Sequence, residues 1–391
     1  MNIRNLFVAA ALASCCMGAA AQAFVCGADV SWCTEMEADG KKFYDKNGQQ
    51  TELMQLMRQT GMNAVRLRVW VNPEADYGAW CDKADVLVKA RRAKAAGLDV
   101  MIDFHYSDRF ADPGQQYKPS AWAALSGDAL KEAVSSHTKE VLQALKDEGI
   151  EPRWVQVGNE TRPGMIFDDG KLNWSVSGEA TWSGYVALSN AGYDAVKQVL
   201  PEAQVIVHID KAKDDNAWFY TAFKQYGGRF DMIGLSHYPD WAGWSSDNTS
   251  AAYQVKRLHQ RFQVPVMLVE TGYDAWDEDR AYNVMADLFQ KTEQLEGCAG
   301  IFYWEPEVYG GWKPEAYTRW GWNSYNMGAF TPQGRPSKAL TPFGSVAAGI
   351  IGLHHSKECS SPMMFDTLGR PAPADGRKGI GISEGRKVAN R

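Results

Sequence analysis

The sequence is poor in several features that would place the protein in other classes. It has no excess of basic residues, because 41 Lys and Arg are outnumbered by 47 Asp and Glu, which gives a formal charge of -6. Nucleic-acid binding relies on clustered Lys and Arg that meet the phosphates, so we expect no nucleic-acid partner. Beyond the N-terminus, no segment approaches the ~20 consecutive apolar residues that cross a bilayer.

Several catalytic signatures are also missing. The first predicted strand is not followed by G-x-G-x-x-G, which argues against a dinucleotide-binding sheet. No G-x-S-x-G supports a nucleophilic serine, and no H-E-x-x-H supports a zinc site. His105, His237 and Asp103 could in principle bind zinc, but they lack the spacing of paired ligands. We therefore expect no catalytic metal and no required cofactor.

Aromatic residues are the feature that the sequence has in excess. It contains 15 Trp, 16 Tyr and 15 Phe, and a Trp content equal to the Phe content is more than core packing needs. Flat rings present apolar faces, which suit ligands that are part apolar and part polar, such as sugars.

Residues 1–23 have the pattern of an export signal. Arg4 provides the positive start, an apolar run follows from Leu6 to Ala13, and Ala21-Gln22-Ala23 matches a small-x-small cleavage site. We therefore expect an exported protein, either secreted or periplasmic. A second interpretation stays open, because the residues before Cys15 resemble a lipoprotein box that would leave Cys15 lipidated on the cell surface.

The middle of the chain alternates short β-like runs with longer helical patterns. Several strands are almost wholly apolar, which is typical of a parallel sheet covered by helices. Eight such units in about 325 residues predict a closed (β/α)8 TIM barrel, with an open doubly wound sheet as the alternative. The predicted strands are 24–30, 63–69, 98–104, 153–158, 205–209, 231–236, 266–270 and 300–304. The predicted helices are 49–59, 83–96, 128–148, 181–200, 214–226, 251–262, 278–295 and 337–350.

These segments define the expected domain organisation. We expect the signal at 1–23, a single catalytic barrel at 24–355 and a C-terminal tail at 356–391. The tail reads as a linker followed by a short β-forming or sorting segment. Parts of it resemble the tails of secreted proteins of the Bacteroides–Prevotella group.

Two glutamates lie at the ends of predicted strands on opposite sides of the barrel. Glu160 follows the fourth strand, and Glu270 ends the seventh. Both carboxyls should therefore reach the rim where barrel enzymes build their active sites. Two carboxyls that flank one bond perform glycoside hydrolysis. A single strand-end Glu could equally cap a helix or pair with Arg, but two of them, with Asn159 before the first, favour catalysis.

Further polar and aromatic residues follow other strands at the same rim. Arg66 and Arg68 share one side of the second strand, so both point either into the lumen or into the helix layer. A cation beside a nucleophilic carboxylate keeps it ionised, and Arg66 is the candidate for that role. The third, sixth and eighth strands end with Asp103, His105, Tyr106, His237, Tyr238 and Trp304.

Several motifs resemble those of clan A glycoside hydrolases, and within the clan those of family 53, the arabinogalactan endo-β-1,4-galactanases. The resemblance runs from Gly27 to about Gly344. It rests on stretches that occur in the same order, namely 27–31 (GADVS), 65–73 (VRLRVWVNP), 103–108 (DFHYSD) with 111–113 (ADP), 155–160 (VQVGNE) and 302–306 (FYWEP).

The resemblance implies a retaining mechanism with two Glu residues. Glu160 would be the acid/base, Glu270 the nucleophile, and Asn159 a contact to the sugar 2-hydroxyl. Burial and an ionised Glu270 nearby should raise the pKa of Glu160 so that it can donate a proton. Further residues match positions that orient the nucleophile or line the central subsite, namely Arg66, His105, His237, Tyr238 and Trp304. Less direct sugar contacts are expected from Asp103, Trp70 and Trp122.

The implied substrate is β-1,4-galactan, the backbone of type I arabinogalactan in pectin. Some relatives hold a structural calcium ion in their last long loops, but its ligands cannot be assigned within residues 307–327. We expect a monomer. Two alternatives stay open: another clan A endo-glycanase, such as a β-mannanase or xylanase, and a non-catalytic glycan-binding barrel. The second should lack one of the two carboxyls, and this chain has both.

The barrel also gives positions to the cysteines and tryptophans. Cys33 follows the first strand and Cys81 lies after the second, so we expect a disulfide between them, and a Cys26–Cys298 pair is also in reach. Many tryptophans fall in rim loops, where some should contact sugar and others pack loops together: Trp70, Trp80, Trp122, Trp174, Trp241, Trp244, Trp276, Trp304, Trp312, Trp320 and Trp322.

Overall fold

The structure is a computed structural model. It describes residues 23–73, 80–173, 179–319, 321 and 323–347, together with four short strands between 364 and 389. The expected signal at 1–23 lies outside these residues except for its last position, and so does most of the tail from 348 onward. Among the helices in the described ranges, none combines the length and apolar character that a bilayer crossing requires.

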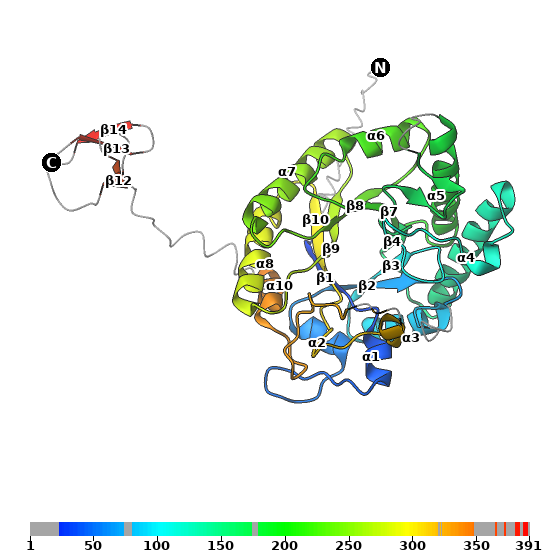
Figure 1. The fold of residues 1–391 in the computed structure, drawn as a ribbon, viewed down its shortest axis with the longest axis horizontal. Helices are drawn as coiled ribbons and strands as arrows, with labels where there is room; N and C mark the ends of the chain where they lie inside the picture. Colours follow the sequence, from blue (N-terminus) through cyan, green and yellow to red (C-terminus); the bar gives the residue numbers. More distant parts are fainter. Residues whose placement is uncertain are drawn as a thin grey trace, which may run out of the picture.

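Eight parallel strands close into a barrel, which confirms the predicted (β/α)8 class. Each strand lies within two residues of its predicted position, and helices surround the ring (Figure 1). Because β1 pairs with both β2 and β10, the sheet has no free edge, and the open-sheet alternative is excluded. In spatial order, the strands are β1 (Val25–Asp29), β10 (Cys298–Trp304), β9 (Val266–Thr271), β8 (Met232–His237), β7 (Gln204–Ile209), β4 (Trp154–Val157), β3 (Asp99–Phe104) and β2 (Ala64–Val69).

One principal helix follows each strand. These helices are α2 (Leu53–Gln59), α3 (Lys83–Ala95), α4 (Gly127–Asp147), α5 (Glu179–Val199), α6 (Ala217–Gln225), α7 (Trp244–Phe262), α8 (Glu278–Thr292) and α10 (Thr341–Ala347). Helix α2 begins later than predicted because Glu52 caps it, accepting a 2.8 Å hydrogen bond from Gln55 N. Helix α7 begins seven residues earlier than predicted, since its first turns are polar and lack the apolar spacing that marks a buried face.

Short elements in the loops were not predicted from the sequence. They are α1 (Cys33–Ala38), a 3-10 turn η2 (Ser120–Trp122), the pair β5 (Gly164–Met165) and β6 (Gly170–Lys171), α9 (Glu315–Arg319), and the 3-10 turn η3 (Lys338–Leu340). Such single turns carry too few residues for a periodic signal. A separate antiparallel sheet in the tail has the order β12 (Pro371–Ala372), β11 (Met364–Phe365), β13 (Ile380–Ser383) and β14 (Arg386–Ala389).

Residues of alternating parity on the strands separate the helix layer from the lumen. Val65, Leu67 and Val69 on β2 belong to the large core between strands and helices. Their neighbours Arg66 and Arg68 point the other way, and both are fully buried. The two arginines therefore lie in the lumen, which resolves the choice that their spacing left open.

The lumen has an apolar floor beneath a layer of polar side chains. The floor is formed by Val25, Ala64, Met101, Trp154, Ile206, Met232, Met267, Val269 and Phe302. The large Phe302 ring fits because Gly27 faces it, where a Cβ atom would lie 2.3 Å from the ring. Buried polar residues follow on the same strands: Asp29, Arg66, Asp103, Gln156, His208, Ser236 and Glu270. The sequence thus separates stability and chemistry along the barrel axis.

The expected disulfides are not present, because the described cysteines are free thiols. Cys81 Sγ lies 3.6 Å from the Ser31 carbonyl oxygen and 3.7 Å from Lys89 Nζ, so it is directed at these groups. A shared rim did not bring Cys33 and Cys81 into the bonding geometry that a disulfide requires. For the second pair, the parallel register sets Cys26 opposite Ile301, three residues beyond Cys298.

Candidate active site

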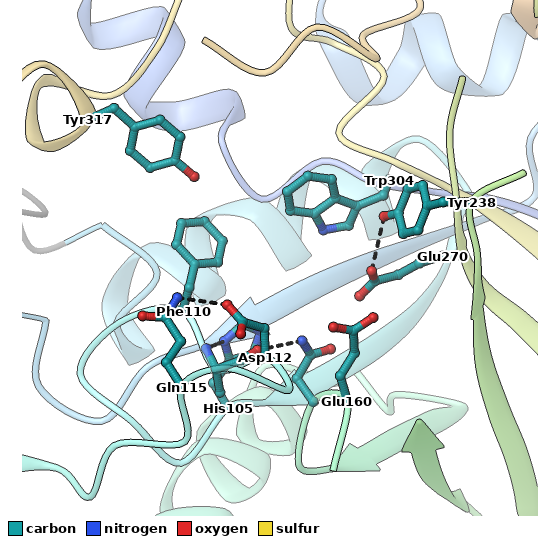
Figure 2. Close-up of a pocket in the computed structure, with 11 residues that line it drawn as sticks. His105, Phe110, Asp112, Gln115, Glu160, Tyr238, Glu270, Trp304 and Tyr317 are labelled. Atoms are coloured by element: carbon teal, nitrogen blue, oxygen red, sulfur yellow. Dashed lines mark hydrogen bonds between the residues drawn. The ribbon is translucent and has the colours of Figure 1, made fainter. Parts of the chain in front are cut away.

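A pocket of about 450 Å³ opens at the C-terminal ends of the strands. Six of the predicted site residues line it: His105, Asn159, Glu160, Tyr238, Glu270 and Trp304. Five further lining residues were not predicted: Phe110, Ala111, Asp112, Gln115 and Tyr317. Figure 2 shows the carboxyl groups of Glu160 and Glu270 extending toward one another in this pocket.

Glu160 reaches the pocket through an unusual turn after β4. Gly158 has a φ of +91°, and a side chain there would lie 2.5 Å from Thr161 Cγ2. Glu160 itself has a φ of +48°, in the left-handed region that most residues avoid. Its backbone N–H is directed at His208 Nδ1, 3.3 Å away. Strain of this kind is commonly retained where it orients a functional side chain.

Glu270 is held at the end of β9 by groups on both of its carboxyl oxygens. Arg66 Nη2 lies 2.8 Å from Oε1. The Tyr238 hydroxyl donates to Oε2 over 3.1 Å, and the Ser236 hydroxyl approaches the same oxygen at 3.3 Å. Charge-assisted and neutral hydrogen bonds together fix the position of this carboxylate and favour its ionised form.

Arg66 connects Glu270 to the rest of the polar layer. Its Nη1 lies 2.6 Å from Asp29 Oδ2, and its Nη2 lies 2.9 Å from Asp103 Oδ2. The side-chain oxygens of Gln156 and Asn159 accept further hydrogen bonds, each of 2.7 Å. One guanidinium thus joins several strands across the lumen, using the donor fork that makes Arg suited to buried ion pairs.

The two facing carboxyls have different electrostatic surroundings. Burial raises the pKa of Glu160 well above its usual 4.5, and the charge of Glu270 raises it further. Burial raises the pKa of Glu270 to about 7, while Arg66 opposes the rise. Because only Glu270 has a cation in direct contact, it loses its proton first. The pair is therefore suited to hold one proton, with Glu160 protonated and Glu270 ionised.

His208 and Ser236 form a polar connection beneath the pocket that the sequence did not reveal. Ser236 Oγ lies 2.8 Å from His208 Nε2 and interacts with both Glu270 and Glu160. Burial and the nearby Arg66 charge lower the pKa of His208 well below 6.5, which keeps the ring neutral. Gln156 Nε2 and the Glu160 backbone N–H approach Nδ1, which favours the tautomer that carries its proton on Nε2.

His105 is oriented from three sides at the edge of the pocket. Its Nε2 lies 2.9 Å from Asp103 Oδ2, while its Nδ1 accepts hydrogen bonds from Trp70 Nε1 at 3.2 Å and from Ala111 N at 3.0 Å. Burial alone would raise the pKa of Asp103, but Arg66 and His105 hold it below its usual range. Asp103 and Trp70 therefore lie behind His105 and support it, outside the set of residues that line the pocket.

Two other predicted residues lie away from the pocket. His237 follows Ser236 and so has the opposite parity, which directs it to Asn248 Oδ1 on α7 at 2.8 Å. Trp122 is buried, and its ring packs edge-on against His137 at 6.0 Å. The structure brings neither side chain together with Glu160 and Glu270.

An aromatic wall beside the pocket surrounds a second buried arginine. The Arg68 guanidinium lies 4.7 Å from the Phe110 ring centroid, 5.1 Å from that of Trp32 and 5.3 Å from that of Trp70. It also forms an ion pair with Glu305, which follows Trp304. Arg68 thus stabilises the wall that carries Phe110 and does not contact Glu270.

The other charged groups near the site are accounted for within the described residues. Arg162, in the loop after β4, forms a two-pronged ion pair with Asp210, with contacts of 2.5 and 2.9 Å. In the part of the chain that the structure describes, no three His, Cys, Asp or Glu side chains are grouped to hold a metal ion.

Comparison with known proteins gives a consistent match. Residues 25–343 match the family described as glycosyl hydrolase family 53. Over 312 residues the chain is 33% identical to the arabinogalactan endo-beta-1,4-galactanase of Cellvibrio japonicus, and the alignment covers 72% of this chain and 80% of that protein.

Solved structures extend the match to three dimensions. The Ignisphaera aggregans GH53 catalytic domain superimposes with a TM-score of 0.73 and 30% identity, covering 83% of this chain and 96% of that domain. A fungal beta-1,4-galactanase gives a TM-score of 0.70 and 26% identity, covering 81% of this chain and 98% of that structure.

Proposed function

Because the chain belongs to glycosyl hydrolase family 53, we propose that this glycoside hydrolase is an endo-acting β-1,4-galactanase with Glu160 and Glu270 as its catalytic pair. The observation that carries the proposal is their placement in one pocket, with Arg66 Nη2 2.8 Å from Glu270 Oε1. The printed names of the relatives support galactan as the substrate.

In the first proposed step, the Glu270 carboxylate attacks the anomeric carbon while Glu160 transfers its proton to the leaving glycosidic oxygen. A covalent glycosyl ester forms on Glu270, and the shortened galactan chain leaves with the proton. Arg66 and Tyr238 favour the carboxylate form of Glu270 before attack. The raised pKa of Glu160 favours its acid form at the same time.

In the second step, Glu160 acts as the base. The ester no longer carries the Glu270 charge, so the pKa of Glu160 falls and it can accept a proton from water. The resulting hydroxide attacks the anomeric carbon, breaks the ester and releases Glu270 as a carboxylate. Two inversions leave the product with the configuration of the substrate.

The shared Ser236 hydroxyl supports retention over inversion. Its oxygen is 3.3 Å from Glu270 Oε2 and also interacts with Glu160. One hydroxyl that contacts both carboxyls keeps their oxygens within roughly 6–7 Å of each other. Retaining enzymes use separations near 5 Å, whereas inverting enzymes need about 6.5–9.5 Å to admit a water molecule.

A product assay tests the proposal directly. The purified protein is incubated with galactan, mannan, xylan and glucan, and the anomeric configuration of the first products is followed by NMR. We expect short β-1,4-galactooligosaccharides from galactan alone, released first as the β-anomer. Cleavage of mannan or xylan in preference to galactan would support the other clan A activities, and an initial α-anomer would exclude double displacement.

We also propose that the protein acts outside the cytoplasm as a monomer and needs no cofactor. The pattern of residues 1–23 supports export, because a polymeric substrate is met outside the cell. Mass spectrometry of the mature N-terminus distinguishes cleavage after Ala23 from lipidation at Cys15. Activity that survives a chelator, in a fraction of monomer size, is the expected result, and its loss with the chelator would indicate a required metal.

A further inference from the structure

Two aromatic rings stack on the rim beside the pocket. Trp241 lies in the loop after β8 and Tyr273 in the loop after β9. Their ring centroids are 5.7 Å apart, and the ring planes differ by only 6°. The Tyr273 hydroxyl donates to the Trp241 carbonyl oxygen over 3.1 Å, so stacking and hydrogen bonding together join the two loops.

One face of the Trp241 ring is left open by this arrangement. The Arg280 guanidinium stands 4.1 Å from the Trp241 ring centroid and also interacts with the Tyr273 hydroxyl. That interaction could not reach through the plane of the indole, so Arg280 and Tyr273 cover the same face. Half of the Trp241 surface is exposed, which agrees with an opposite face that is free.

Trp276 stands close by in the same loop as Tyr273. Its backbone N–H donates to Asp274 Oδ1 over 2.9 Å, just before helix α8 begins. The residue is 84% exposed, more than any other large apolar side chain in the described part of the chain. Single exposed aromatics are ordinary on protein surfaces. A stacked Trp–Tyr pair with a second Trp three residues further on is a built platform.

The platform is continuous with the pocket. Tyr238 lines the pocket and precedes Trp241 by three residues, a chain length of at most about 10 Å. The Tyr238 ring also packs on the Trp241–Tyr273 side, since a Cβ built on Gly272 would lie 3.4 Å from it. A chain that leaves the pocket past Tyr238 therefore meets the open face of Trp241.

We propose that Trp241 and Trp276 form a further carbohydrate-binding site, which holds galactosyl units several residues away from the bond that is cleaved. The proposal rests on the galactanase function and adds a polymer-binding site to it. In a β-1,4-galactosyl unit the axial O4 gathers the C3, C4 and C5 hydrogens on one face. That apolar face matches the open indole, and Arg280 at its edge can hydrogen-bond to sugar hydroxyls.

The test compares a long substrate with a short one. Trp241→Ala, Trp276→Ala and the matched control Tyr253→Ala, an exposed aromatic residue on α7, are assayed on polymeric galactan and on an aryl galactobioside. We expect kcat/KM on galactan to fall about five- to tenfold in each Trp variant, mainly through KM. The control should behave as wild type, and activity on the short substrate should change less than twofold.

A second arm separates binding from catalysis. In a Glu270→Ala background, migration through a gel that contains galactan should be retarded, and Trp241→Ala should relieve the retardation whereas Trp241→Phe keeps most of it. Unchanged kcat/KM on galactan in both Trp variants, or equal losses on the two substrates, would overturn the site. A wild-type protein that cleaves another polymer and not galactan would overturn the proposed function instead, and the comparison is then made on that polymer.

Discussion

The Tyr238 hydroxyl donates a 3.1 Å hydrogen bond to Glu270 Oε2 (Figure 2). The other oxygen of the same carboxylate contacts Arg66, so a phenol and a guanidinium hold the two oxygens separately. The phenol lies at the pocket surface, whereas Arg66 also links Asp29 and Asp103 in the buried layer. Tyr238 is therefore the contact through which Glu270 can be altered with the least effect on the fold.

The Tyr238→Phe variant should shift the acid limb of the pH–activity profile. The Tyr238 hydrogen bond lowers the pKa of Glu270, which burial has raised to about 7. Without the hydroxyl that pKa rises, so Glu270 ionises only at higher pH. We expect the acid limb of kcat/KM to move upward, while the alkaline limb, which reports Glu160, stays in place. Initial rates between pH 4 and 10 measure both limbs.

Tyr253→Phe provides the control for this measurement, because Tyr253 is exposed on α7 and far along the chain from the site. Its profile should match that of the wild type. An acid limb that stays unchanged in Tyr238→Phe would mean that Glu270 is not the group whose ionisation starts the reaction.

Removing either catalytic carboxyl should abolish most activity through different steps. Glu270→Ala should reduce kcat on galactan by on the order of 10⁴-fold or more, since no ester can form. Glu160→Gln should reduce it about 10²- to 10⁴-fold, but much less on an aryl galactoside whose leaving group needs no proton. Steady-state rates on both substrates separate the roles.

Glu151→Gln, at an exposed position at the opposite end of β4, is the matched control and should retain full activity. Thermal melts should show that all three variants fold. If Glu270→Ala kept substantial activity, the assignment of the nucleophile would be incorrect.

The Arg68–Glu305 ion pair should be stabilising only as a pair. Both side chains are fully buried, and Arg68 also packs among Phe110, Trp32 and Trp70. Arg68→Met leaves Glu305 as an unpaired buried carboxyl and should cost about 3–5 kcal/mol of unfolding free energy. The double variant Arg68→Met/Glu305→Gln should recover a large part of that loss. Denaturant titrations of the wild type, both single variants and the double variant test this, and strictly additive losses would contradict it.

A second buried carboxyl, Glu307, should make stability fall as the pH rises. Its two oxygens have no hydrogen-bond partner, and burial together with the Glu305 charge raises its pKa well above 4.5. A carboxyl with a raised pKa binds its proton more tightly in the folded state. It therefore stabilises the fold below its unfolded pKa, and this contribution is lost as the pH rises through the folded pKa.

Glu307→Gln removes this titration while keeping the side-chain shape. The difference in unfolding free energy between pH 5 and pH 8 should be smaller in the variant, by about 1 kcal/mol for each pKa unit that is removed. Melting temperatures at the two pH values measure the change. A pH dependence equal to that of the wild type would show that Glu307 does not titrate in this range.

Sequence reasoning placed the barrel strands well because buried parallel strands are continuous apolar runs. The same property hid His208, which lies within the run Val-Ile-Val-His-Ile and was taken as part of a strand without a role in the site. The signal that could have found it is parity, because His208 faces the same way as Ile206 in the lumen floor. Parity also separates Ser236, which reaches the site, from His237, which packs on α7.

Loop residues were predicted less completely, because their positions depend on contacts that sequence spacing does not specify. Trp304 ends a strand and lies in the pocket as expected. Trp70 also follows a strand, but its indole N–H turns to His105, and Trp122 packs on His137. Phe110 and Tyr317 enter the pocket from loops that carry no periodic pattern.

The left-handed backbone at Glu160 affects how this enzyme can be redesigned. With a φ of +48°, the position disfavours β-branched residues whatever their side-chain chemistry, while Gly, Asn and Asp fit the backbone more readily. A saturation library at residue 160 would therefore report conformational fitness as well as acid strength. For an acid-free scaffold that accepts an added small nucleophile, Gly or Asn is a better starting point than Val or Thr.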